Sequence, residues 1–255
     1  MTPEDDVLVA LAEQQAELSR LLAGLTTDQW SAGTRCVGWT VADVVLHLAQ
    51  TNEMARGSLE DRLAEVTASL TRGTTGGFAD VDEGAAAMVA AERGARPDVL
   101  CQRWDAGADE LRKAFEVTDA HRRVTWVAGQ LSARTLAATR LAETWIHTGD
   151  VAEAVGVVLA PGERLRHVAR LAWRTLPYAF ARAGRELAGP VSFELEGPAG
   201  GRWIFAPEEP PVTVVRGPGV ELCLVAGRRL DPAATSLRAE GPDAAAVLSL
   251  IRTYA

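Results

Sequence analysis

The sequence is short of cysteine and of long apolar runs, and each shortage excludes a class of protein. Its three cysteines, Cys36, Cys101 and Cys223, lie far apart and form no Cys-x-x-Cys pair. They predict reduced thiols of an intracellular protein rather than a disulfide framework. No segment approaches the roughly 18 uninterrupted apolar residues of a transmembrane helix. Residues 4–6 are acidic, whereas a signal peptide begins with positive charge, so we expect a cytoplasmic protein.

Basic charge is also scarce. The 255 residues include 26 Lys and Arg against 34 Asp and Glu, which gives a formal net charge of -8. A nucleic-acid-binding protein usually carries a basic stripe, and adsorption to an anionic membrane needs basic clusters. We therefore expect no nucleic-acid or membrane partner. Hydrophobic residues make up 47% of the chain, enough for one large folded domain or two small ones.

The first two thirds of the sequence have apolar residues at three- and four-residue intervals, which is the spacing of amphipathic helices. Thr40 and Ser132 are typical N-cap residues at the starts of two such segments. Four long helices joined by loops predict an antiparallel four-helix bundle. The expected helices cover about residues 4–24, Thr40 to 70, 81–117 with a kink near 94–97, and Ser132 to 156.

The last third differs in composition. A fifth helix is expected over about 163–185, and after it Pro and Gly separate short runs of β-branched and aromatic residues. Such runs have the length and composition of strands. They predict strands at 191–195, 202–205 and 212–215 and short helices at about 218–226 and 242–253. The predicted fold class is therefore α+β with two domains, a helical bundle over 1–185 and a small α+β domain over 186–255.

The chain has only four histidines, His47, His121, His147 and His167. Glu143 and His147 are four residues apart, which places them on one face of a helix, and a bundle can bring His47 opposite them. Two imidazoles and a carboxylate suit zinc or a similar divalent metal, and three protein ligands leave the open position of a catalytic site. The Glu-x-x-x-His pair alone is more often a helix hydrogen bond, so the residues by themselves leave both interpretations open.

Two longer segments resemble a known family. Residues 36–49 (CVGWTVADVVLHLA) resemble the GWTVADVVAHL segment of the mycothiol-dependent maleylpyruvate isomerase family, a branch of the DinB-like metal-binding four-helix bundles. Residues 141–156 (LAETWIHTGDVAEAVG) resemble its second signature, an E-x-x-x-H-x-x-D helix that ends in Gly. The resemblance implies that His47, Glu143 and His147 are the metal ligands. Residues 231–242 resemble, more loosely, the last strand and turn of the sterol-carrier-like C-terminal domain that the family often carries.

The resemblance also implies a reaction. The metal, expected to be zinc, would bind a low-molecular-weight thiol such as mycothiol as the thiolate. In an isomerase the thiolate adds to a conjugated cis alkene of a small unsaturated acid, the single bond rotates, and loss of the thiol gives the trans product. Thiol transfer is known on the same scaffold. Two alternatives stay open: a thiol-independent biosynthetic enzyme acting on a larger metabolite, and a non-catalytic module that binds a metal or an apolar ligand.

Four further residues are candidates for the site. Asp150 follows His147 by three positions, so it is either a proton carrier beside the site or a surface acid paired with Arg. Trp39 is a candidate wall of the cofactor-binding pocket. In the tail, Arg229 is a candidate for cofactor binding and Arg238 for catalysis, because arginine clamps carboxylates. Most arginines are simply surface charges.

Two residues near the first motif receive a plainer interpretation. Asp43 lies four residues before His47 and either orients its imidazole or only caps the helix that Thr40 begins. Cys36 has no evident basic partner in the sequence, so we do not expect a catalytic thiol there.

Overall fold

The computed structural model describes residues 6–71, 78, 80–127 and 129–253 and divides into two compact units. Residues 6–159 form a helical unit, and the C-terminal unit begins at Ala160 and contains a four-stranded sheet with helices. The predicted α+β two-domain class is confirmed. None of the described helices is both long enough and apolar enough to cross a lipid bilayer.

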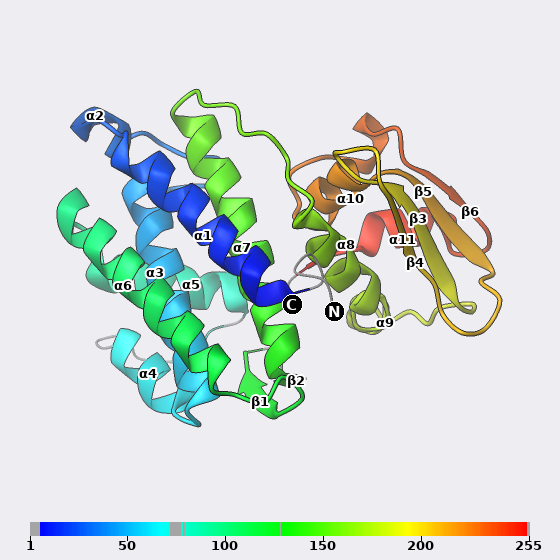
Figure 1. Cartoon of the computed structure of the whole chain (residues 1–255), viewed down its shortest axis with the longest axis horizontal. Helices are drawn as coiled ribbons and strands as arrows, with labels where there is room; N and C mark the ends of the chain where they lie inside the picture. The colour runs from blue at the N-terminus through cyan, green and yellow to red at the C-terminus, as the bar shows by residue number, and fades with distance from the viewer. Residues whose placement is uncertain (1–5, 72–77, 79, 128, 254–255) are drawn as a thin grey trace. The chain divides into compact units, whose positions relative to one another are not determined.

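Four long helices build the N-terminal unit (Figure 1). α3 packs against α6 and α7, and α1 packs against the same two helices, so each has two long neighbours. Their apolar faces close a core that includes the fully buried Trp104 and Leu141. The four helices are α1 (Val7–Ala23), α3 (Val41–Leu59), α6 (Pro97–Glu116) and α7 (Ala133–Ala154).

Shorter elements complete this unit. They are α2 (Thr27–Trp30), α4 (Leu63–Leu70), α5 (Val81–Glu92), β1 (Arg123–Trp126) and β2 (Gly129–Ser132). The two strands pair antiparallel as a hairpin in the region where the sequence predicted only a turn. The predicted start of the first helix near residue 4 lies outside the described residues.

Two predicted helices are each divided in two. The segment from Thr40 to 70 breaks after Leu59, where Asp61 takes a positive φ of 58° that a helix cannot contain. The segment 81–117 is interrupted before Pro97, the first residue of α6, and Gly94 in the gap has a φ of 101°. Because glycine reaches this conformation without a steric penalty and proline favours a first helical turn, the kink becomes a full break.

The helices that carry the candidate site begin at strong local signals. Thr40 and Asp43 form a capping box at the start of α3, with the Thr40 side chain accepting from the Asp43 N–H. Ser132 caps α7 and accepts a hydrogen bond from the N–H of Thr135 at 3.2 Å. These caps satisfy N–H groups that a helix start leaves unpaired and so fix where each helix begins.

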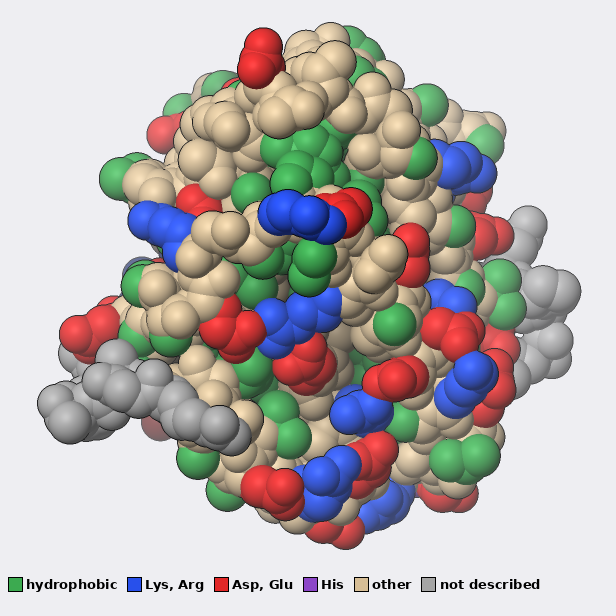
Figure 2. All heavy atoms as spheres, turned by 90° about the vertical axis from the view of Figure 1, so that its left-hand side faces the viewer, with side chains coloured by type: hydrophobic (Ala, Val, Ile, Leu, Met, Phe, Trp, Pro, Cys, Tyr) green, Lys and Arg blue, Asp and Glu red, His purple; other side chains and the backbone are tan. Residues whose placement is uncertain are grey.

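On the face shown in Figure 2, basic and acidic side chains are intermixed, with apolar side chains between them. Ion pairs also connect the helices: Arg103 of α6 contacts Glu53 of α3 at 2.7 Å and also pairs with Glu92 of α5. The network holds α5 and α6 to α3, the helix that carries His47.

The C-terminal unit is a four-stranded sheet in the order β4-β3-β5-β6 with helices around it. β3 and β5 are parallel, and the outer strands pair antiparallel with them. The predicted strands and short helices are confirmed, with ends shifted by a few residues. The elements are α8 (Leu165–Arg174), α9 (Leu176–Arg182), β3 (Val191–Glu196), β4 (Arg202–Phe205), β5 (Thr213–Pro218), α10 (Gly219–Ala226), the short 3-10 helix η2 (Pro232–Ala234), β6 (Arg238–Glu240) and α11 (Ala244–Leu250).

The division between the units lies earlier than the expected 185/186. The predicted fifth helix is split into α8 and α9, and both belong to the C-terminal unit. Trp173 of α8 donates a hydrogen bond to the Val191 carbonyl of β3 at 2.8 Å, and its ring stacks on Phe205 at 6.3 Å between centroids. The composition changes near 186, but these contacts tie the preceding helices to the sheet, so the units separate at 159/160.

We predict that Ser132→Ala lowers the free energy of unfolding by about 1 kcal/mol, because the first turn of α7 loses the acceptor for the Thr135 N–H. Urea denaturation followed by circular dichroism measures the change. The control is Ser31→Ala, whose side chain is exposed and whose effect should stay within about 0.5 kcal/mol. An equal effect of the two substitutions would contradict the assigned role of the cap.

Candidate metal centre

The helix α7 aligns the candidate ligands along one face. Arg140, Glu143 and His147 lie at positions i, i+3 and i+7, which share a side of an α-helix. α3 packs against this helix and supplies His47, nearly two turns after its cap. The site therefore depends on two helices whose starting points are fixed by their own N-caps.

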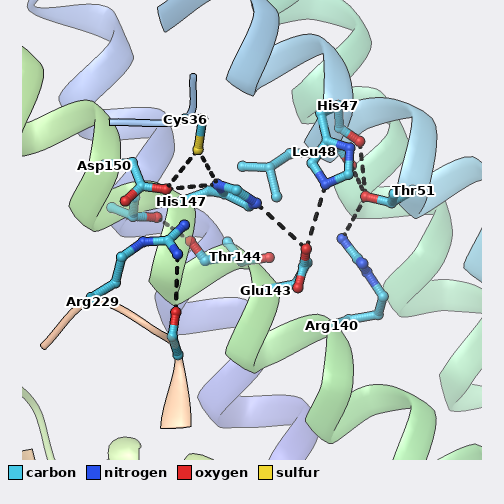
Figure 3. Close-up of polar contacts among 12 residues, drawn as sticks. Cys36, His47, Leu48, Thr51, Arg140, Glu143, Thr144, His147, Asp150 and Arg229 are labelled. Atoms are coloured by element: carbon cyan, nitrogen blue, oxygen red, sulfur yellow. Dashed lines mark hydrogen bonds and ion pairs between the residues drawn. The ribbon is translucent and has the colours of Figure 1, made fainter. Parts of the chain in front are cut away.

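The structure brings His47, Glu143 and His147 together. The Nε2 atoms of both imidazoles lie 3.4 Å from the same oxygen, Oε1 of Glu143, and the three ligand atoms all lie within 4.8 Å of one another. Figure 3 shows the carboxylate reaching both rings. The two histidine side chains are 7% and 9% exposed, whereas the Glu143 side chain keeps 24% of its surface exposed. The cluster is thus buried on its imidazole side and open at the carboxylate.

These distances fit a shared metal ion better than direct hydrogen bonds. A contact of 3.4 Å is long for a hydrogen bond, for which about 2.7–3.2 Å is usual. Two atoms bound to one tetrahedral zinc at about 2.0–2.1 Å would lie about 3.3–3.4 Å apart. Imidazole nitrogen and carboxylate oxygen are also the donor types that zinc accepts. The residues present therefore fit a divalent metal with one coordination position left for another ligand.

The second nitrogen of His147 has a fixed partner. Its Nδ1 lies 2.9 Å from Oδ2 of Asp150, whose side chain is 1% exposed. In the neutral imidazole that binds a metal, a hydrogen bond from Nδ1–H to the carboxylate would leave the lone pair on Nε2, the atom that faces Glu143. Asp150 is thus a buried acid beside the site and not a surface acid. Its role in catalysis stays a prediction.

The charges of the cluster are strongly coupled. Burial lowers the pKa of His147, but hydrogen bonds with Asp150, Cys36 and Glu143 outweigh it and raise the pKa well above its usual value. Burial likewise raises the pKa of Glu143, yet hydrogen bonds from His147 and His47 hold it well below its usual value. For His47 burial prevails and the pKa is lowered. Without a metal, the site at neutral pH holds a cationic His147, an anionic Glu143 and a neutral His47.

Comparison with known proteins places the chain in a family. Residues 11–152, more than half of the chain, match the family model of the mycothiol maleylpyruvate isomerase N-terminal domain. The chain belongs to this family. Two uncharacterised proteins, from two strains of Mycobacterium tuberculosis, are each 30% identical to it over 246 residues, which cover 96% of this chain and 93% of the relative.

Solved structures show the same fold. Two crystal structures of mycothiol-dependent maleylpyruvate isomerase, one of them a His-to-Ala mutant, match this chain with TM-scores of 0.59 and 0.60. Each match covers 95% of this chain and 96% of the other, at 19% and 18% identity respectively. At this identity the likeness establishes the fold, and the residues of the site must be argued from this chain itself.

Cys36 lies closer to the site than the sequence indicated. Its Sγ is 3.4 Å from Oδ2 of Asp150 and 3.9 Å from Nδ1 of His147. The sequence analysis found no basic partner because His147 is remote in the chain, and only the packing of the loop before α3 brings the two together. Cys36, His147 and Asp150 form a second group whose ligand atoms are close enough to hold a metal ion, but hydrogen bonds to the Asp150 carboxylate account for this arrangement.

The first motif places Trp39 beside His47 and supplies a helix cap. The ring of Trp39 lies 5.1 Å from that of His47, and its roles as a pocket wall and in cofactor binding stay predictions. Both oxygens of Asp43 are engaged away from His47. One accepts hydrogen bonds from the N–H and hydroxyl of Thr40 at 2.9 Å, and the other pairs with Arg93 at 2.9 Å. Asp43 therefore caps the helix and holds Arg93.

The two arginines predicted from the tail belong to the C-terminal unit. Arg229 donates a hydrogen bond to the Gly227 carbonyl at 2.9 Å. Arg238 is exposed on the edge strand β6, opposite Arg216 of β5. Their assignments, Arg229 to cofactor binding and Arg238 to catalysis, stay predictions.

Arg140 is a residue that the sequence analysis missed. It is only 2% exposed and donates from Nη2 to Thr51 Oγ1 at 2.8 Å, four residues after His47. Burial lowers its pKa to about 10, against the opposing effect of Glu143, so it stays cationic at neutral pH. Its spacing of three residues before Glu143 was a signal that it shares the ligand face.

We predict that Asp150→Asn weakens zinc binding by about 10- to 100-fold, because the imidazole of His147 loses the carboxylate that orients it and increases its basicity. Competition with a chromophoric chelator measures the affinity. Glu153→Gln, one turn later on α7 and exposed, is the matched control and should leave it unchanged. An Asp150→Asn protein with wild-type affinity would contradict this role.

Proposed function

We propose that this protein is an enzyme that uses a divalent metal, zinc in the first place, to activate a low-molecular-weight thiol for reaction with a small unsaturated acid. The proposed ligands are His47, Glu143 and His147. The reaction class is cis-trans isomerisation or thiol transfer. Membership of the mycothiol maleylpyruvate isomerase family supports the reaction class, and the geometry of this chain supports the metal.

One observation carries the proposal. Two buried imidazoles from different helices direct Nε2 at a single oxygen of Glu143, at the same distance of 3.4 Å. A helix hydrogen bond would need only one of them. A structural zinc site would add a fourth protein ligand, whereas three ligands leave a position for a reactant. This favours catalysis over a purely structural metal.

Different residues have different roles around the open coordination position of the metal. A metal held there would act as a Lewis acid that lowers the pKa of a bound thiol, so that a nucleophile exists at neutral pH. Asp150 holds the imidazole of His147 in one tautomer. Trp39 packs beside His47. The Glu143 side chain keeps 24% of its surface exposed, and we expect small molecules to approach the site from there.

We predict that the purified protein carries about one zinc per chain and that His147→Ala abolishes stoichiometric binding while the helical circular dichroism signal persists. Zinc must displace the proton of His147, whose pKa is raised well above its usual value. Affinity should therefore fall as the pH is lowered through that pKa, and the loss should begin above pH 6.5. Atomic absorption after dialysis at a series of pH values measures both effects.

The matched control for this experiment is His121→Ala, because His121 is exposed and lies outside the cluster. Its zinc content should equal that of the wild type. Full zinc content in His147→Ala would refute the ligand assignment. A wild-type zinc content that does not change from pH 8 to pH 5 would contradict the competition between zinc and the proton.

We predict that a thiol binds the zinc-loaded protein with release of about one proton, because a free thiol has a pKa of about 8.5 and enters as its thiolate. Binding should tighten as the pH rises toward that value. Calorimetry in buffers of different ionisation enthalpy counts the protons for mycothiol and N-acetylcysteine. N-acetylserine, with a hydroxyl in place of the thiol, is the control and should release no proton on binding.

Two results would contradict the thiol mechanism. One is the absence of binding by either thiol to zinc-loaded protein, and the other is binding without proton release. Zinc binding would then stand alone, and thiol-independent chemistry on a larger metabolite would become the leading function of this scaffold.

A further inference from the structure

The guanidinium of Arg140 is a buried charge whose hydrogen bonds go only to neutral groups. Nη2 donates to Thr51 Oγ1 at 2.8 Å and to Asn52 Oδ1 at 3.4 Å. Among the residues that the structure describes, Nε has no hydrogen-bond partner although it is fully buried. Glu143 influences Arg140 only through its charge. A cation in this position lacks the carboxylate that buried arginines usually have.

A purely structural role does not account for this residue. Burying a charged group without a counter-ion is strongly unfavourable, and a neutral donor could hold Thr51 at lower cost. Arg140 also makes no hydrogen bond or ion pair with Glu143 among the described residues, and that carboxylate contacts the two imidazoles, each at 3.4 Å, instead. The positive charge of Arg140 is therefore available to pair with an anionic group of a bound molecule.

The position of Arg140 indicates what that group is. It lies one turn before Glu143 on the same face of α7, and Thr51 lies one turn after His47 on α3. Figure 3 shows the guanidinium beside Thr51 and on the same side of the helix as the Glu143 carboxylate. A molecule of a few carbon atoms that reacts at the shared position thus has Arg140 within reach of its far end.

A second unsatisfied donor belongs to the same hydrogen-bonded cluster. The Nδ2 of Asn52 is buried without a partner in the described part of the chain, while Oδ1 of this side chain accepts from Arg140. Neither Arg140 Nε–H nor Asn52 Nδ2–H thus has an acceptor among the described residues. A carboxylate has two oxygens and accepts several hydrogen bonds at once, and arginine binds it in a bidentate manner.

We propose that Arg140, assisted by Asn52, binds a carboxylate of the substrate and so restricts the enzyme to small acids. This inference rests on the proposed function for the reacting position and adds the residue that selects the substrate class. Arg140 anchors the acid at a distance from the metal ligands and thereby fixes which carbon atoms of the substrate face them.

The test measures binding of maleate, a small unsaturated dicarboxylate, to the zinc-loaded protein by calorimetry. Arg140→Met should weaken binding by about 10- to 100-fold, the effect expected for loss of charge-assisted hydrogen bonds. Dimethyl maleate, which has the same carbon skeleton without the charge, should bind the wild type no better than it binds Arg140→Met. Arg134→Met, also on α7 and only partly buried, is the matched control and should keep wild-type affinity.

Two further variants keep the test decisive if Arg140→Met does not fold. Arg140→Lys retains the charge with one donor group and should bind maleate several-fold more weakly than the wild type. Asn52→Ala leaves the guanidinium in place and should lose a smaller factor than Arg140→Met or Arg140→Lys. Far-ultraviolet circular dichroism confirms the folding of each variant.

The outcomes separate this inference from the proposed function. Zinc content is measured for every protein, so failure of the metal proposal appears as absent zinc. Unchanged maleate affinity in folded Arg140→Met or Arg140→Lys would overturn the role of Arg140, because a carboxylate bound only to the metal would not depend on it. Absence of maleate binding by the zinc-loaded wild type would overturn it as well.

Discussion

The candidate site depends on one interaction, the convergence of two imidazoles on a single carboxylate oxygen between α3 and α7. Neither helix holds the cluster alone, since His47 comes from α3 and Glu143 and His147 come from α7. The caps at Thr40 and Ser132 set where these helices begin. The Arg103 ion pairs with Glu53 and Glu92 hold neighbouring helices against α3. The packing of the bundle thus keeps the three candidate ligand atoms within 4.8 Å of one another.

Burial of these side chains changes the pKa values of the residues that converge. Burial opposes charge on every member of the cluster. Hydrogen bonds with Asp150, Cys36 and Glu143 nevertheless raise the pKa of His147, and those from His147 and His47 lower the pKa of Glu143. A divalent cation can replace the proton on His147 and interact with all three groups at once. Asp150 lies 2.9 Å from Nδ1 of His147, the nitrogen on the far side of the ring from Glu143. Arg140 adds a buried cation near the cluster, and its pKa of about 10 keeps it charged at neutral pH.

Local signals allowed much of the fold and the central cluster to be predicted from the sequence. N-caps and the spacing of apolar residues predicted the main helices. The four-residue spacing of Glu143 and His147 placed them on one helix face, and the family resemblance identified His47 as the third ligand. Contacts between residues remote in the chain could not be predicted from the sequence. Such packing brings Cys36 to His147, ties Trp173 to the sheet and so moves the division between the units, and buries Arg140. The breaks near Asp61 and Gly94 depend on backbone conformations that periodicity does not report.

The most direct measurement is anomalous diffraction at the zinc edge from crystals of the zinc-loaded protein. The account predicts one peak at about 2.0–2.2 Å from Nε2 of His47, Nε2 of His147 and an oxygen of Glu143. A peak between Cys36, Nδ1 of His147 and Asp150 would move the metal to the other cluster. The absence of a peak at both positions in zinc-loaded crystals would contradict the central claim.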